Sequence, residues 1–549
     1  MVNIERHFET HTVENQPVPL APYNYWANDP LLKQAVRESG VSAPPDILDK
    51  FGAIAGAKLA EAGEHANKNK PVFNPFDRYG RRINSVTFHP SYHELMAESM
   101  KANVHNYSWQ NYQQPGAHVI RAALLFMQCQ ADAGTTCPLT MTHAAYPALK
   151  QGSALPAYWV DKLVHGSYDP RELPAKDKHG ITLGMGMTEK QGGSDVRTNT
   201  TTATKQADGS YSIVGHKFFF SAPMSDAHLI LAQAEGGLSC FLLPRIREDG
   251  SLNKVQIQRL KDKLGDWSNA SSEVEFTGAN AFLVGNEGRG IAVILDMVSL
   301  TRLDCMIGST AIMRQALVQA TYHVTHRAAF GKPLIEQPLM QNVLADMTLE
   351  WSAHLALTMR VAQAIDTAPN NAQEAAFARI ATAIGKYWVC KRAPVLINEA
   401  QECLGGIGYV EENILPRLYR QAPLNSIWEG SGNVQCLDVL RALVKEPSTK
   451  TALFSVLAQA KGKNTHYDQF LTSLSSQFED MNNLEIRSRL ITEHTALALQ
   501  AALLLTHYDP KLAASFCETR LGHQHGHTFG TLPAHTPFEH IITLGQLTK

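Results

Sequence analysis

Thirteen consecutive residues hold the clearest catalytic pattern of the chain: Arg420-Gln421-Ala422-Pro423-Leu424-Asn425-Ser426-Ile427-Trp428-Glu429-Gly430-Ser431-Gly432. They place one carboxylate, Glu429, beside a large aromatic side chain and directly before a Gly-Ser-Gly turn. Glycine lets the backbone approach a ligand closely, and a carboxylate that projects into a cleft can remove a proton from carbon. Glu429 is therefore the candidate catalytic residue. The alternative for an acid before glycine is a solvated turn.

A second segment lies far upstream: Gly184-Met185-Gly186-Met187-Thr188-Glu189-Lys190-Gln191-Gly192-Gly193-Ser194-Asp195. Together the two segments resemble the acyl-CoA dehydrogenase flavoproteins, and in detail the AidB-like branch associated with the response to alkylation damage. Other matching pieces lie in order along the chain: Cys137-Pro138-Leu139-Thr140-Met141-Thr142, Gly215-His216-Lys217-Phe218-Phe219-Phe220-Ser221, Lys261-Asp262-Lys263-Leu264-Gly265, His326-Arg327-Ala328-Ala329-Phe330-Gly331 and Leu404-Gly405-Gly406-Ile407-Gly408-Tyr409. The resemblance is strong up to about Lys445.

Composition is that of an ordinary soluble globular protein, with 549 residues, 44% hydrophobic and 18% charged. The formal net charge of −2 gives no general attraction to nucleic acid or anionic lipid. Eight cysteines are scattered singly, without the spacing of a zinc site, so no metal is predicted and the thiols are expected to be reduced. The segment Met1–Pro17 lacks the features of a secretory signal or an organelle presequence. The apolar run Ala496–Thr506 is interrupted by Gln500 and is too short to span a bilayer. We therefore expect a cytoplasmic protein that does not enter membranes.

Hydrophobic spacing divides the chain into four parts. Residues 1–180 show mainly helical spacing, 181–289 short β-branched and aromatic runs between turns, 290–444 long helical runs typical of a four-helix bundle, and 445–549 an additional, mainly helical segment. The stretch 67–90 is irregular and is expected to pack on the surface or at an interface. The predicted fold is α+β and acyl-CoA dehydrogenase-like, with an extra C-terminal helical domain.

The glycine-rich segment after Gly184 does not fit a Rossmann fingerprint, because Glu189 stands where the third glycine belongs. Its hydroxyls and backbone N–H groups could bind a planar polar ligand, or the segment could be a surface hairpin. The resemblance implies that it lines the flavin and the pyrophosphate of FAD, through Met185, Met187, Thr188, Gly193 and Ser194.

Phe219, Phe220 and Ser221 would bring an aromatic face and a hydroxyl to the flavin edge, with core packing as the alternative for Phe220. Around the candidate base, the resemblance adds Ile427, Trp428, Gly430, Ser431 and Asn433 to the cofactor site.

A further group resembles the family segment that reaches FAD across a subunit interface. Arg327 would pair with a cofactor phosphate and Phe330 would pack near the adenosine, with Gln337 beside them. The basic pair could instead serve a helix dipole. Gly405 and Gly406 would let the backbone approach the dinucleotide, or they could end a helix. The resemblance implies a homotetramer.

The chemistry implied for Glu429 is removal of the α-proton of an acyl thioester while the β-hydrogen leaves as hydride to flavin N5. Acyl-CoA is therefore the implied substrate class, and burial would raise the pKa of the acid to about 6 to 7. The family commonly has Tyr where this chain has Trp428. The bulkier ring would narrow the space above the flavin, which predicts weak turnover.

From Lys445 onward, nine Lys and Arg residues face nine Asp and Glu residues, so this segment has no net charge with His neutral. The resemblance implies that it binds double-stranded DNA, although duplex affinity depends on cations and the composition gives no excess of them. Tetramerisation would multiply a modest patch. The candidate contacts are Arg441, Arg487, Arg489 and Arg520. The alternative is a helical module that only packs on the core or blocks it.

Two other functions compete with this interpretation. One is an efficient long-chain acyl-CoA dehydrogenase whose extension docks on a membrane or partner, but the helix expected at Leu490–Tyr508 has few cations for a membrane surface. The other is an acyl-CoA oxidase or a nitroalkane oxidase. Nitroalkane oxidases place Asp at the base position, where this chain has Glu429.

Overall fold

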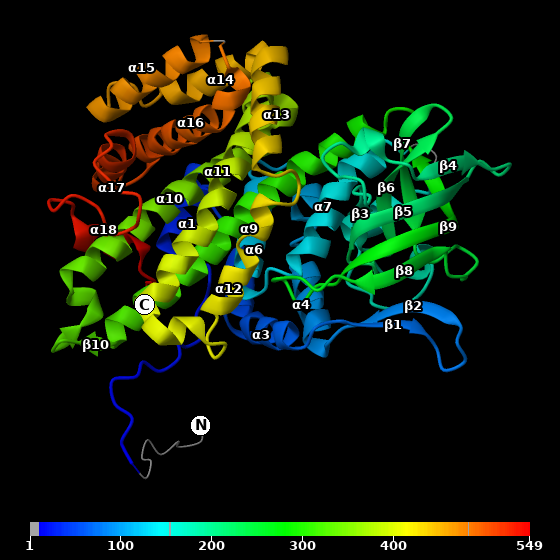
Figure 1. Ribbon diagram of the computed structural model, residues 1–549, viewed down its shortest axis with the longest axis horizontal. Helices are drawn as coiled ribbons and strands as arrows, with labels where there is room; N and C mark the ends of the chain where they lie inside the picture. Colours follow the sequence, from blue (N-terminus) through cyan, green and yellow to red (C-terminus); the bar gives the residue numbers. More distant parts are fainter. Residues whose placement is uncertain (1–9, 153–154, 481, 549) are drawn as a thin grey trace.

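The structure is a computed structural model that describes residues 10–152, 155–480 and 482–548. Figure 1 shows most of the strands gathered on one side of the molecule and long helices on the other, with the last helices, coloured orange to red, stacked outside the bundle. The predicted α+β architecture is confirmed. The beginning of the segment Met1–Pro17, on which part of the localisation prediction depends, lies outside the described residues.

Helices dominate the part before the sheet. In α1 (Pro30–Glu38) the side chain of Asp29 accepts a 3.0 Å hydrogen bond from Leu32 N, and Pro30 takes the first helical position, where no N–H is needed. The buried helix α6 (Ala117–Ala131) packs against the bundle. The other elements are α2 (Ile47–Ile54), the π-helix η1 (Ala55–Leu59), α3 (Ala60–Lys68), α4 (Pro90–Lys101), α5 (Tyr107–Gln110), α7 (Thr136–Lys150), α8 (Tyr158–His165) and η2 (Ala175–Asp177).

The segment 67–90, expected to be irregular, contains a β-hairpin. Strands β1 (Val72–Phe76) and β2 (Arg82–Thr87) pair antiparallel and lie beside strand β8 (Val255–Leu260). Asn84 Nδ2 donates to the carbonyl of Val255 at 3.0 Å, and Asn84 Oδ1 accepts from Ile257 N at 3.2 Å. The strands are hard to recognise in the sequence because Pro75, which has no backbone N–H to donate, interrupts their pairing.

The middle of the chain forms one seven-stranded sheet that closes on itself. Strand β6 pairs with both β4 and β7, and β5 and β9 complete the ring, while β3 and β8 add to its sides. The short runs expected as strands lie in β5, β6, β7 and β9. The elements are β3 (Leu183–Gly186), η3 (Val196–Thr198), β4 (Thr202–Lys205), β5 (Tyr211–Ser221), β6 (Ala227–Ala234), β7 (Gly237–Pro244), β8 and β9 (Ser271–Val284).

Long helices then form the predicted bundle: α9 (Gly290–His326), α10 (Pro338–Thr367), α11 (Ala372–Leu404) and α13 (Gly432–Lys445). The single helix α9 contains the apolar run 291–302 and most of a second apolar run, 312–330, which ends beyond the helix. The residues between them, 303–311, are all buried, so the apolar stripe loses its period there without a break in the helix. The connecting elements are β10 (Ala328–Ala329), β11 (Lys332–Pro333), η4 (Leu334–Glu336), η5 (Ala368–Asn370), η6 (Gly405–Tyr409), α12 (Leu415–Gln421) and η7 (Leu424–Ser426).

The additional C-terminal segment is helical and packs on the bundle through α16 (Leu484–His507), which contacts α10, α11 and α13. Gln500, the polar residue within the apolar run, is buried there and accepts from Trp388 Nε1 at 3.1 Å. No described helix is long and apolar enough to cross a membrane. The other elements are α14 (Pro447–Ala458), α15 (Thr465–Glu479), α17 (Pro510–Phe516), the π-helix η8 (Cys517–Leu521) and α18 (Phe538–Gly545).

Candidate active site

Glu429 lies between η7 and α13 in a left-handed backbone conformation, with φ of +58°. This conformation costs a residue other than glycine about 1–3 kcal/mol, so the surroundings must hold it. Gln435 Nε2 donates to the carbonyl of Glu429 at 3.0 Å, and Arg302 Nε donates to the same carbonyl at 3.2 Å. Lys386 Nζ donates to the carbonyls of Trp428 at 2.7 Å and Gly430 at 2.5 Å. The turn is therefore fixed by side chains of the bundle.

The carboxylate of Glu429 faces helix α9. Thr301 Oγ1 donates a 2.6 Å hydrogen bond to Glu429 Oε2. Burial raises the pKa of Glu429, while the hydrogen bond from Thr301 and the charges of Lys386 and Arg302 act in the opposite direction. A carboxyl group with a raised pKa is a stronger base than a solvated one, which suits proton abstraction.

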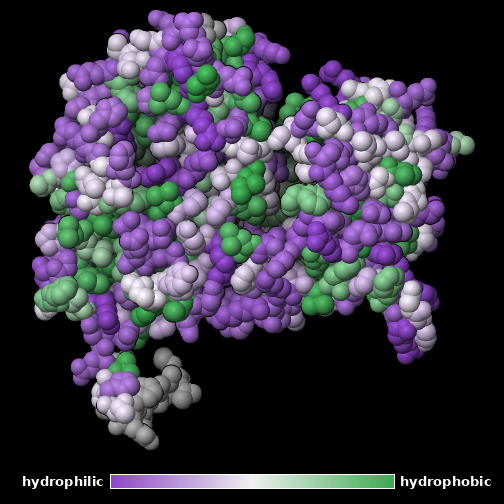
Figure 2. All heavy atoms as spheres, viewed as in Figure 1, coloured by the Kyte–Doolittle hydropathy of each residue, from purple (hydrophilic) through white to green (hydrophobic). Residues whose placement is uncertain are grey.

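Trp428 packs against the same hydrophobic cluster as residues of two other sequence motifs. It is half-buried and packs against a hydrophobic cluster to which Met185, Met187, Cys137 and Met141 also belong. Its indole nitrogen donates to Asn425 Oδ1 at 2.9 Å, which fixes the ring. The surface is hollowed between the helical side and the strand side of the molecule (Figure 2).

The loop expected to hold the cofactor is anchored by a fully buried ion pair. Lys217 Nζ lies 2.7 Å from Glu189 Oε1, and neither side chain is exposed. Burial raises the pKa of Glu189, but the hydrogen bonds from Lys217, Thr201 and Thr200 outweigh it and lower the pKa to about 2. The loop is thus fixed from beneath, which leaves its outer residues for a ligand.

The outer residues of this loop have the form that a closely bound cofactor needs. A Cβ at Gly193 would lie 2.4 Å from Thr188 Oγ1, so no other residue fits there without a shift. Ser194 is exposed. The carbonyl of Thr188 accepts a 2.8 Å hydrogen bond from Phe218 N, which joins the loop to the end of β5.

The three residues at the end of β5 differ in their access. The ring of Phe219 is 51% exposed, and Ser221 is partly buried with its hydroxyl 3.0 Å from that of Ser271. Phe220 is 1% exposed and its ring stacks on His228 at 3.8 Å between centroids. The prediction that the Phe220 side chain contacts FAD is therefore corrected: it is a core side chain, because its strand face points into the sheet.

Residues that flank the base lie near the C-terminal segment. Ile427 is 62% exposed, and Ser431 is exposed at the start of α13. Gly430 has φ of +94°, which continues the left-handed turn. Asn433 Oδ1 accepts a 2.8 Å hydrogen bond from Nε of Arg489, which belongs to α16. Arg489, a predicted DNA contact, therefore forms a hydrogen bond with Asn433, a predicted cofactor contact.

The residues expected to reach FAD from another subunit lie around the β10–β11 hairpin, on the opposite side of the molecule from the sheet in Figure 1. Phe330 is 99% exposed. The side chain of Arg327 donates to the carbonyl of Asn15 at 2.5 Å, and Gln337 donates to the carbonyl of Ala329 at 3.1 Å. At Gly405, as at Gly406, an added Cβ would meet no atom within 4 Å.

The four arginines predicted for DNA do not form one surface. Arg441 is well exposed, with 61% of its side chain accessible, and its guanidinium lies 3.5 Å from Asp438 Oδ1. Arg487 donates to Asp480 Oδ2 at 2.8 Å and to the carbonyl of Gln477 at 2.9 Å, which ties the end of α15 to α16.

The structure corrects the prediction that Arg520 contacts DNA. Only 7% of its side chain is exposed, and it pairs with Asp346 and, at 3.2 Å, with Glu350. Both carboxylates come from α10. Its charge is therefore neutralised inside the fold and does not face solvent, so it is an internal link between η8 and the bundle.

The residues that position Glu429 were missed: Thr301, Arg302, Lys386 and Gln435. Thr301 and Arg302 lie in the part 290–444 that was predicted to be helical, but nothing in their spacing indicates that they face a loop more than a hundred residues away. Lys386 has the stronger signal, since a lysine within an apolar helical run is seldom buried without a purpose.

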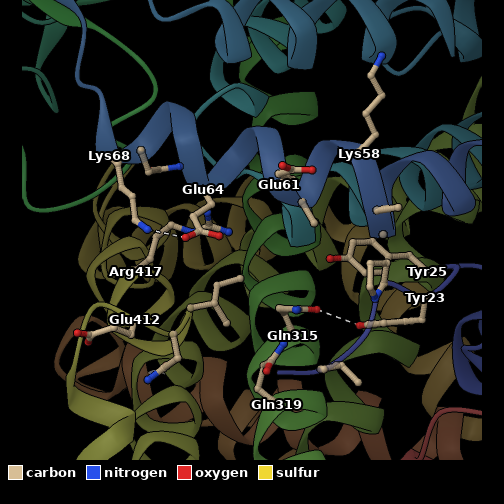
Figure 3. Close-up of a pocket in the computed structure, with 18 of the residues that line it drawn as sticks. Tyr23, Tyr25, Lys58, Glu61, Glu64, Lys68, Gln315, Gln319, Glu412 and Arg417 are labelled. Carbon is tan, nitrogen blue, oxygen red and sulfur yellow. Dashed lines mark hydrogen bonds and ion pairs between the residues drawn. The ribbon is translucent and has the colours of Figure 1, made fainter. Parts of the chain in front are cut away.

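Another hollow, of about 450 Å³, lies between the N-terminal segment, α3 and the bundle (Figure 3). Tyr23 Oη donates to Gln315 Oε1 at 3.0 Å across it, and Lys68 pairs with Glu64 at 2.5 Å on its other side. None of the predicted site residues lines it. It is therefore separate from the Glu429 turn.

Sequence profiles of known families match most of the chain. The adaptive response protein AidB N-terminal domain matches residues 15–170, the acyl-CoA dehydrogenase middle domain residues 184–279, and the acyl-CoA dehydrogenase C-terminal domain residues 288–444. AidB of Escherichia coli (strain K12) is 46% identical over 517 residues, which covers 94% of this chain and 95% of that protein. The chain belongs to the acyl-CoA dehydrogenase family. The AidB-like resemblance is confirmed with it.

Solved structures of the acyl-CoA dehydrogenase family agree. The crystal structure of Caenorhabditis elegans ACDH-11 in complex with C11-CoA matches with a TM-score of 0.84 at 26% identity, covering 94% of this chain and 93% of that one. A match of this extent reaches into the segment 445–549. An acyl-CoA dehydrogenase from Bacillus anthracis, complexed with FAD, matches with a TM-score of 0.64 at 16% identity and covers 90% of this chain and 82% of that one.

Acyl-CoA dehydrogenases depend on FAD, so the predicted cofactor and enzyme class are confirmed: this chain is an FAD-dependent oxidoreductase of the acyl-CoA dehydrogenase type. The residues fit the cofactor. The loop is anchored by the Glu189–Lys217 pair, its turn at Gly193 has no room for a larger residue, and the Phe219 ring is half exposed, so polar and aromatic groups are available to a bound flavin.

Proposed function

We propose that this protein is an AidB-like flavoprotein that binds double-stranded DNA in the response to alkylation damage and retains weak acyl-CoA dehydrogenase activity, with Glu429 as its base. The observation that carries the enzymatic half is the Glu429 carboxylate, fixed at the junction of sheet and bundle with its pKa raised by burial. All eight cysteines are buried and unpaired, which supports a reducing compartment such as the cytoplasm.

Glu429 takes the proton from the carbon next to the thioester carbonyl. The hydrogen bond from Thr301 goes to Oε2, so Oε1 is the oxygen left to receive the proton. When bound, FAD accepts the hydride that leaves the neighbouring β-carbon. Trp428 stands directly before the base and limits the volume of the acyl chain, because its ring is fixed by Asn425. This restriction is the reason for weak turnover.

The residues proposed to hold FAD in one subunit are Met185, Met187, Thr188, Gly193, Ser194, Phe219, Ser221, Ile427, Trp428, Gly430, Ser431 and Asn433. Glu189 and Lys217 support the loop from within. Absorbance of the purified protein tests the assignment. A yellow protein that loses FAD on Ser194→Ala or Phe219→Ala substitution supports it, and a colourless protein that cannot be reconstituted with FAD rejects it.

We propose a homotetramer in which Arg327, Phe330, Gln337, Gly405 and Gly406 serve the FAD of another subunit. The support is exposure: a phenylalanine ring that is 99% exposed on a short hairpin is more stable when another surface covers it. Sedimentation of Phe330→Asp tests this. Dissociation with loss of FAD supports the arrangement, and an unchanged tetramer with unchanged FAD content contradicts it.

DNA binding would use the exposed cations near and within the last segment. These are Arg441, Lys445, Lys461, Lys463, Arg489 and Lys511. Because duplex binding releases counterions, affinity must fall steeply as salt rises. A gel shift with duplex DNA over a salt series is the test. The absence of any salt-sensitive shift would reject the DNA-binding half and leave the enzymatic half standing.

A second function is favoured by one specific observation. The C. elegans structure that covers 94% of this chain, including part of the last segment, is in complex with C11-CoA. The alternative is therefore a long-chain acyl-CoA dehydrogenase whose last helices serve the enzyme or a partner. Rapid flavin reduction by an acyl-CoA of about that length, without DNA binding, would establish it.

A further inference from the structure

Lys386 lies inside the bundle on α11, and only 1% of its surface is exposed. The hydrogen bonds found for its ammonium go to the carbonyls of Trp428 and Gly430, at 2.7 and 2.5 Å. These residues stand on either side of Glu429. Burying an ammonium is unfavourable unless it is well hydrogen-bonded, so its place directly behind the base needs a reason.

We propose that Lys386 is a positioning residue for the base, holding the turn that aims Glu429 and placing a positive charge behind it. This inference rests on the proposed role of Glu429. Arg302 and Gln435 bond the carbonyl of Glu429 itself. Three successive carbonyls thus accept hydrogen bonds from the bundle, and Lys386 supplies two of those bonds.

Several charged, titratable and hydrogen-bonding groups surround Glu429. They are Thr301, Arg302 and Cys305 from α9, Cys137 from α7, Lys386 from α11, and the Arg302 partner Asp438 from α13. Arg302 is paired with Asp438 at 2.7 Å, and Asp438 is shared with Arg379 at 3.0 Å and Arg441 at 3.5 Å. Burial raises the pKa of both thiols, so they stay neutral. The ammonium of Lys386 is bonded to carbonyl groups, which do not neutralise its charge, so Lys386 acts together with Arg302 to stabilise the ionised base.

A purely structural lysine would hold the turn without changing the pH at which the base works. The test therefore separates hydrogen bonding from charge. Lys386→Met removes both, Lys386→Gln keeps a donor without the charge, and Lys386→Arg keeps both. Lys391→Met, a change of an exposed lysine on the same helix, is the matched control.

The probe is a 3-thia-acyl-CoA added to the FAD-loaded protein. The base can remove its α-proton, but the sulfur at the β-position cannot release a hydride, so the enolate remains against oxidised flavin and gives a long-wavelength absorption band. Its pH midpoint is expected to rise by about one unit or more in Lys386→Met and Lys386→Gln. Lys386→Arg and Lys391→Met are expected to keep the wild-type midpoint. An unchanged midpoint in Lys386→Gln would overturn the charge role.

The second readout is hydrogen exchange of peptides covering 424–435 in the protein without substrate. Faster exchange is expected in Lys386→Met than in Lys386→Gln, and equal exchange in wild type and Lys386→Met would overturn the positioning role. Different results would reject the role of Glu429 as the base and the role of Lys386 as a positioning residue. If the wild type gives no band at any pH while FAD is bound, the role of Glu429 fails, and the exchange experiment still decides whether Lys386 holds the turn.

Discussion

Thr301 and Glu429, 128 residues apart in sequence, are joined by a hydrogen bond of 2.6 Å from the threonine hydroxyl to Oε2. Such a bond favours the ionised carboxyl group, because a carboxylate accepts more strongly than a carboxylic acid. Burial acts in the opposite direction and raises the pKa of Glu429. The pH at which the base is ready depends on the balance of these two effects.

Replacing Thr301 by Val removes the hydrogen bond while keeping the shape of the side chain. The pKa of Glu429 should rise further, by about one unit or more, since a hydrogen bond to a charged group contributes about 1.5–3 kcal/mol. A base works when it is deprotonated, so the rising limb of the pH profile of flavin reduction should move to higher pH. Thr301→Ser should stay close to wild type, and a Val variant with an unmoved limb would contradict the assignment.

Replacing Trp428 by Tyr should speed the reduction of flavin by acyl-CoA by about tenfold or more, because a small change in pocket volume is worth about 1–3 kcal/mol. The smaller ring gives the acyl chain room beside Glu429. Anaerobic rapid mixing with acyl-CoA substrates of several lengths measures the effect. If the Tyr variant is as slow as the wild type with every length, the restriction lies elsewhere.

Replacing Glu189 by Gln breaks the buried pair with Lys217 and should lower stability by about 3–5 kcal/mol, with release of FAD at lower temperature. Glu275→Gln, at an exposed position on β9, is the control. FAD fluorescence during heating follows both variants. Loss of FAD at the wild-type temperature in Glu189→Gln would show that the pair does not support the loop.

The same pair gives a pH dependence with a definite sign. The pKa of Glu189 is lowered to about 2 from an ordinary 4.5. Its contribution to stability is therefore complete above about pH 4.5 and is lost as the pH falls toward 2. The difference in unfolding free energy between wild type and Glu189→Gln should shrink over that range.

The DNA proposal separates two arginines. Arg441→Gln removes an exposed charge and should reduce the slope of log affinity against log salt by about 1. Arg520→Gln should leave that slope unchanged and instead destabilise the protein by about 3 kcal/mol, because it removes the arginine paired with buried Asp346 and leaves Glu350 with Arg392 alone of its two arginines. Gel shifts in a salt series and thermal unfolding measure the two effects. The reverse pattern would contradict the structure.

Local pattern explains which parts of the fold could be predicted. The strands at Tyr211 and Leu229 and the helix Ala372–Leu404 follow from hydrophobic period and turn residues, which act over short distances. The hairpin Val72–Thr87 could not be predicted because its strands are stabilised by hydrogen bonds to Val255 and Ile257, far along the chain. Helix α9 lost its period because it is buried along 303–311.

The same distinction between local pattern and interactions of distant residues applies to the candidate active site. Glu429 and the loop around Gly193 stand out because their chemistry lies in consecutive residues. Lys386 gives only a hint, because its partners come from another segment. Arg520 was misassigned because composition cannot tell a solvent-facing cation from one that is paired with α10 inside the fold.

The central claim is that Glu429 removes the substrate proton. The most direct measurement is the rate of flavin bleaching after anaerobic mixing of acyl-CoA with wild type and with Glu429→Gln, each loaded with FAD to the same extent. Because a general base contributes about 10²–10⁴-fold, we expect Glu429→Gln to bind FAD normally but to slow bleaching by at least about a hundredfold. Bleaching at the wild-type rate would contradict the account.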